Sequence, residues 1–261
     1  MAIFSSLYGA RLDRELGTDD STVLFTTARR KAAINEAQAE FADLTECLAR
    51  QAVVSVTAGT AEYNLNSTTV IAGGDFVRFS KEQVQYRVTS TAGARTVLSG
   101  DDLPRRDVEW LNRYEPGWQD STEASSIARS PRYYYLRPDG GNLYLGVYPP
   151  PGLSSNSTAS LVVPYLAAPT PLTSDTSEPF TVNSSARTDL RPYHQALVHY
   201  AAHQLEKLRR DDQAADRQLQ VFLGYVARYT QQMRKKGGQA LTFARAYFGT
   251  RRTPYADDPR R

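Results

Sequence analysis

Apolar positions at helical spacing mark residues 25–51 as an amphipathic helix. Its stripe recurs every three or four residues and consists of Ile34, Ala37, Phe41, Leu44 and Leu48. Thr26 or Thr27 stands at the N-terminal end, where a hydroxyl oxygen caps the first free amides. Residues 1–25 show weak periodicity and a charged patch, so we expect an N-terminal arm there.

Helical periodicity disappears after residue 52. Up to residue 168, short runs rich in β-branched and aromatic residues alternate with Gly, Ser and Asp clusters. This alternation is typical of short antiparallel strands, so residues 53–168 are expected to form a β-domain insert. Within it, the polar segment 103–120 contains Trp110 and Trp118 and is expected to form a short helix and a loop.

Two further helices are predicted after a Pro-, Thr- and Ser-rich linker at residues 169–188. Their apolar stripes are Leu197, Tyr200, Ala201, Leu205 and Leu208 in the first, and Ala215, Leu219, Phe222, Val226, Tyr229 and Met233 in the second. The short connection between them makes these helices antiparallel neighbours. The predicted fold class is α+β: a three-helix bundle of residues 26–52 and 189–236, interrupted by an antiparallel β-domain and followed by an extended tail at residues 237–261.

The stretch from Ser130 to Gly152 predicts a tyrosine-rich hairpin with Asp139 and Gly140 at its turn. This register places Tyr134 opposite Leu145 on a core-facing side. The other side carries Tyr133, Tyr135, Tyr144 and Tyr148, with Tyr133 across from Gly146, which its ring can cover. The main interpretation is a well-packed piece of scaffold. The alternative is a subunit or tail interface made by these four tyrosines, because tyrosine is enriched at protein interfaces.

Charge is unevenly distributed along the chain. Residues 228–261 carry nine Arg or Lys and two Asp, whereas the rest carries 22 basic and 26 acidic side chains. The body is therefore mildly acidic and the C-terminal end strongly basic, which indicates an acidic protein surface or nucleic acid as a partner. No apolar run is long enough for a membrane span, and we expect neither a secretory signal nor a membrane partner. A single cysteine, Cys47, favours synthesis in a reducing cytoplasm.

Candidate catalytic chemistry is sparse. His199 and His203 are four residues apart in a predicted helix, a spacing that suits zinc, and Glu206 lies on the same face. The glutamate that a metalloprotease needs after its first histidine is missing, however. Surface or interface histidines are the preferred interpretation, and no phosphate-binding loop or nucleophile motif is present. We therefore expect no enzyme, no cofactor and no metal.

The basic tail is the strongest remaining signal, because aromatic anchors and arginines alternate in it. The candidate partner-binding residues are Arg234, Lys235, Lys236, Phe243, Arg245, Tyr247, Phe248, Arg251, Arg252 and Tyr255. A solvated end is the competing interpretation.

In the order of its parts, the chain resembles the head-to-tail adaptor (connector) proteins of tailed bacteriophages. The resemblance covers residues 24–236. It is carried by AINEAQAEF (33–41), by NLYLGVYPPPG (142–152) and LVVPYLAAPTPL, and by the two closing helices between Asp189 and Tyr229.

The resemblance implies a structural virion protein, made in the host cytoplasm. Its subunits would form a ring, usually of twelve copies in this family, that docks on the portal protein, extends the DNA channel and offers a surface to a tail or nozzle protein. Genomic DNA would pass through without sequence-specific binding, and the C-terminal tail would reach the portal. The alternative function is a nucleic-acid-binding protein that uses the basic tail.

Overall fold

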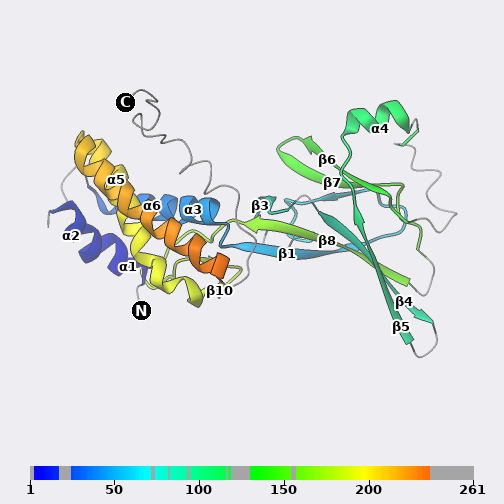
Figure 1. Cartoon of the computed structure of the whole chain (residues 1–261), viewed down its shortest axis with the longest axis horizontal. Coiled ribbons are helices and arrows are strands. Elements are labelled where there is room, and N and C mark those ends of the chain that lie inside the picture. Colours follow the sequence, from blue (N-terminus) through cyan, green and yellow to red (C-terminus); the bar gives the residue numbers. More distant parts are fainter. Residues whose placement is uncertain are drawn as a thin grey trace, which may run out of the picture. The chain divides into compact units, whose positions relative to one another are not determined.

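The computed structural model describes residues 3–17, 25–71, 74–81, 83–92, 95–115, 117–118, 130–153 and 157–235. The chain divides into two compact units. One, the helical unit, comprises Met1–Cys47 and Pro169–Arg261, and the other, the β unit, comprises Leu48–Ala168. Helices and antiparallel sheets thus occupy separate units, which confirms the predicted α+β class (Figure 1).

The helical unit is built around α3 (Thr27–Thr45), α5 (His194–Arg209) and α6 (Asp212–Lys235). Phe41 of α3 packs against α6, and its ring centroid lies 6.1 Å from those of both Phe222 and Tyr229. Thr26 caps α3 by accepting a hydrogen bond from the amide of Arg29. The helices α5 and α6 run side by side after a short turn, as their short connection predicts (Figure 1).

The expected helix over residues 26–52 was wrong at its C-terminal end. Helix α3 ends at Thr45, and Glu46 adopts a left-handed conformation with φ of 50°. Residues 49–51 instead begin strand β1 (Ala49–Val56). The sequence pattern did not show this helix end for two reasons. No glycine follows the helix, and Leu48, although it lies beyond the helix, is at the spacing of the apolar stripe.

The segment before α3 also differs from the expected arm. Residues 4–16 form α1 (Phe4–Ser6), the π-helical turn η1 (Leu7–Arg11) and α2 (Leu12–Leu16). Their buried side chains, Phe4, Leu7, Leu12 and Leu16, are at most 3% exposed. Phe4 and Leu7 are three residues apart, and Leu12 and Leu16 are four apart. This helical spacing was missed because Gly9, with non-helical backbone angles, interrupts the regular period between the two pairs.

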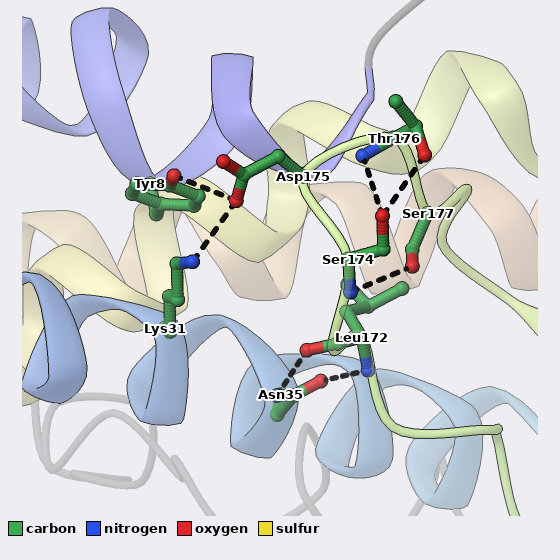
Figure 2. Close-up of polar contacts among 8 residues, drawn as sticks. All are labelled: Tyr8, Lys31, Asn35, Leu172, Ser174, Asp175, Thr176 and Ser177. Atoms are coloured by element: carbon green, nitrogen blue, oxygen red, sulfur yellow. Dashed lines mark hydrogen bonds and ion pairs between the residues drawn. The ribbon is translucent and has the colours of Figure 1, made fainter.

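Hydrogen bonds hold residues 169–187, here called the strap, against α3 (Figure 2). The amide of Leu172 donates to the Asn35 side chain at 2.7 Å, and the Leu172 carbonyl accepts from it at 3.2 Å. Asp175 accepts hydrogen bonds from Lys31 and from the Tyr8 hydroxyl, both at 2.9 Å. The strap contains the small strand pair β9 (Thr181–Val182) and β10 (Ser185–Ala186), and η3 (Thr188–Tyr193) leads from it into α5.

Two antiparallel sheets make up most of the β unit. The larger has the order β1–β8–β4–β5, with β3 (Phe76–Phe79) also paired to β8 (Ser157–Ala167). Strands β4 (Val84–Ala92) and β5 (Arg95–Leu103) form its long hairpin. The smaller sheet has the order β2–β7–β6, made by β2 (Glu62–Asn64), β6 (Tyr133–Asp139) and β7 (Asn142–Tyr148).

Candidate functional site

The tyrosine-rich hairpin β6–β7 turns at Gly140 and Gly141, whose φ angles are 56° and 86°. Two consecutive positive φ angles define a tight turn that favours glycine at both central positions. The predicted turn, one residue earlier, was therefore wrong. Tyr134 pairs with Val147 instead of Leu145. The observed pairing differs from the predicted one by two residues, so every side chain lies on the face of the hairpin that was predicted for it.

An aromatic ring does cover Gly146, but it belongs to Tyr135 and not to Tyr133. Tyr135 lies directly across from Gly146 in the register. A β-carbon built on Gly146 would stand only 2.0 Å from Cζ of the Tyr135 ring. The glycine is therefore required by the close approach of this ring.

Helix α4 (Val108–Tyr114) and the turn that follows it pack over this face of the hairpin. Leu111, Trp118 and Tyr135 form a small buried core, and the Trp118 and Tyr135 rings meet edge to face with centroids 5.0 Å apart. Tyr148 packs against the same core. Tyr135 is 2% exposed, so this residue of the candidate interface is part of the packing inside the β unit.

Helix α4 and strand β6 meet at an arginine–aromatic cluster, defined here as Arg106, Trp110, Tyr114 and Tyr133. The Arg106 guanidinium lies 4.9 Å from the Trp110 ring centroid and 5.4 Å from that of Tyr133. Trp110 also contacts Tyr114, which is 58% exposed. Of the four tyrosines proposed as an interface, only Tyr133 belongs to this cluster. Neither Arg106 nor Tyr114 was predicted from the sequence, although Tyr114 lies four residues after Trp110 on the same helix, the spacing that brings side chains together.

On the other strand, Tyr144 lies beside a second polar group. The Arg137 guanidinium is 5.1 Å from the Tyr144 ring centroid and binds both carboxylate oxygens of Glu62, at 2.9 and 2.6 Å. These hydrogen bonds hold the pKa of Glu62 below its usual value. The Tyr135 hydroxyl donates to the same carboxylate at 3.1 Å. A pocket of about 380 Å³ opens beside this group.

The candidate tail residues fall into two groups. Arg234 and Lys235 form the last turn of α6 and are exposed. The others, Lys236, Phe243, Arg245, Tyr247, Phe248, Arg251, Arg252 and Tyr255, lie outside the residues that the structure describes.

The three histidines are buried, so their interpretation as surface residues was wrong. Nδ1 of His199 is 2.7 Å from Oε1 of Gln218, and Nδ1 of His203 is 2.8 Å from the Ala215 carbonyl. These contacts join α5 to α6. In the described part of the chain, no three His, Cys, Asp or Glu side chains are grouped so that they could hold a metal ion.

Cys47 is buried as well, and desolvation raises the pKa of its thiol to about 12. A thiol with such a pKa is almost entirely protonated at neutral pH, so it is a poor nucleophile. None of the described helices is both long enough and apolar enough to span a bilayer.

A search of curated proteins found no match to the chain. The sequence model of the family described as SU10 adaptor protein matches residues 4–252. This range is wider than the resemblance read from the sequence, since it includes α1, α2 and part of the basic tail. The chain belongs to the SU10 adaptor protein family, which confirms the resemblance to phage head-to-tail adaptors.

Proposed function

We propose that this protein is a structural subunit of the virion that forms a ring on the portal, extends the DNA channel and presents a surface for tail attachment. The observation that carries the proposal is the family match over residues 4–252. Adaptors of this kind work with other head and tail proteins and are typically not enzymes. The buried, hydrogen-bonded histidines and the protonated thiol of Cys47 agree with a structural role.

The two charged regions of the chain have different roles in this proposal. The basic tail binds the portal, with arginines as rim contacts around its aromatic anchors. The mildly acidic body avoids holding the DNA that must move through the ring. The arginine–aromatic cluster beside α4 is the tail-protein contact, because arginine, tryptophan and tyrosine dominate the binding energy of interfaces.

Native mass spectrometry of the chain, alone and mixed with the portal encoded beside it, tests this function. A twelvefold ring of the 29.0 kDa chain has a mass of about 350 kDa. We expect that ring alone or on the portal. A chain that stays monomeric and ignores the portal would contradict the proposal.

The basic tail favours one other candidate function, nucleic-acid binding. That function predicts duplex affinity whose logarithm falls linearly with the logarithm of salt concentration, with a slope of about −0.9 for each phosphate contacted. Absence of duplex binding at low salt removes it.

A further inference from the structure

The outer face of α6 is basic around an apolar centre. Arg217 and Arg228 are exposed, and no ion pair involves either of them within the described residues. Arg234 and Lys235 continue the positive charge to the end of the helix, and Asp216 is the acidic residue on this exposed side. Between the arginines, Val221 is 44% exposed.

Gly224 occupies the middle of this face. A β-carbon built there would meet no described atom within 4 Å, so packing within the chain does not require glycine at this position. Glycine is among the least favourable residues in a helix interior, and alanine would fit the same space. Glycine here lowers the stability of the helix and is not needed for packing within the described chain. Another surface that approaches the helix backbone closely would explain its presence.

The outer face of α3 has the opposite charge. Glu36, Glu40 and Asp43 follow one another at spacings of four and three residues. Burial, with added repulsion from Asp43 and Glu36, raises the pKa of Glu40. Glu36, Glu40 and Asp43 give this face of α3 its acidic character.

A hollow of about 460 Å³ lies beside this acidic face, between α3 and α5. Ala32, Ala33, Leu205 and Leu208 make it largely apolar, and Leu208 is 55% exposed. Glu36 stands at its edge, and Arg29 is the basic residue of its lining. A small apolar side chain from outside would occupy part of the hollow and cover Leu208 at the same time.

We infer that the α6 face of one subunit packs against the α3 face of the next subunit, with Val221 entering the hollow. This inference rests on the ring of the proposed function and names its interface. The two faces belong to the same helical unit, but they are different surfaces with opposite charge. A contact between unlike faces is heterologous, which is the kind of contact that closes a ring.

The opposite charges of the two faces favour their pairing with each other. Two α6 faces would place arginines against arginines, and two α3 faces would place carboxylates against carboxylates; both arrangements are repulsive. The mixed pair joins opposite charges around an apolar centre. Each face has one residue of the other sign, Arg29 on the α3 face and Asp216 on the α6 face, and these two residues also carry opposite charges.

Charge reversal with rescue tests this interface. The α6 variant is Arg217→Glu with Arg228→Glu, and the α3 variant is Glu36→Lys with Glu40→Lys. Assembly of the full-length chain, with and without portal, is followed by native mass spectrometry over a dilution series at low salt. Each double variant is expected to raise the concentration needed for half assembly by about tenfold or more. The quadruple variant restores opposite charges and should assemble at nearly the wild-type concentration.

Two further variants separate the interface from folding. Gly224→Leu places a bulky side chain in open space, so circular dichroism should show a folded chain while assembly is lost. Arg14→Glu, at an exposed position on α2, is the matched control and should assemble normally.

The outcomes distinguish the two proposals. Wild-type rings with unaffected variants would overturn the interface and leave the proposed function standing. Variants that form rings normally but no longer load on the portal would assign these faces to the portal, which also overturns the inference. A wild-type chain that forms no ring under either condition would refute both.

Discussion

Gln38 is the residue whose replacement tests most directly how the strap is held. Its side chain is 1% exposed on α3. The amide nitrogen donates to the Thr170 carbonyl at 3.1 Å, and the oxygen accepts from the buried amide of Phe180 at 2.7 Å. One side chain thus satisfies two backbone groups of the strap that are ten residues apart.

In Gln38→Leu, the shape of the side chain is nearly kept and both hydrogen bonds are lost. The Phe180 amide is left buried without its partner, which costs about 1–3 kcal/mol, and the loss of the Thr170 bond adds about 1 kcal/mol. We therefore expect the helical unit to lose about 2–4 kcal/mol of unfolding free energy. With an m-value of about 2–3 kcal/mol per molar urea, the midpoint falls by about 1 M.

The chain provides a convenient internal control for this measurement. Both tryptophans, Trp110 and Trp118, lie in the β unit, so their fluorescence follows that unit, whereas far-ultraviolet circular dichroism follows mainly the helices. The dichroism midpoint should fall much further than the fluorescence midpoint. Gln220→Leu, the same change at an exposed position of α6, should shift neither. A dichroism shift for Gln38→Leu no larger than that of Gln220→Leu would refute the reasoning.

Four other variants or reagents give equally definite expectations. Gly146→Ala should destabilise the β unit by at least about 2 kcal/mol, because the new methyl group collides with the Tyr135 ring; an unchanged fluorescence midpoint in urea would contradict this. Cys47 should resist a thiol-specific reagent in the native protein at pH 8 and react fully in urea, since burial raises its pKa to about 12; rapid native labelling would show otherwise. Because burial and like charges raise the pKa of Glu40, its ionisation opposes folding. Glu40→Gln should therefore stabilise the chain slightly at pH 7, by about 0.5 kcal/mol or less, and this gain should vanish as the pH falls below about 4; a gain that persists in acid would rule out the charge as its cause. Finally, Gly224→Ala should stabilise unassembled chains by about 1 kcal/mol in thermal or urea unfolding, and destabilisation would mean that the position is not open.

Part of the candidate site was predictable from local rules. The side of the hairpin on which each tyrosine lies follows from the two-residue period of a strand, so it survived an error in the turn. The exact partner of Tyr135 did not follow, because the stretch Asp139–Gly140–Gly141 offers two possible turn positions. Only the conformation of Gly140 and Gly141 selects between them.

The sequence by itself determined the class of the fold and the main elements. The periods in α3, α5 and α6 and the alternation in the β unit are strong enough to be seen without the structure, because each element must bury one continuous face. The family resemblance likewise depended on the order of these elements along the chain.

The tertiary structure alone decided what covers each face. It placed α4 over Tyr135, joined Gln38 to the strap, and brought the hollow together from α3 and α5. These contacts join residues far apart in the chain, and no local pattern encodes which surfaces will meet. The physical reason is that periodicity reports only that a face is apolar, while its partner is chosen by packing of the whole unit.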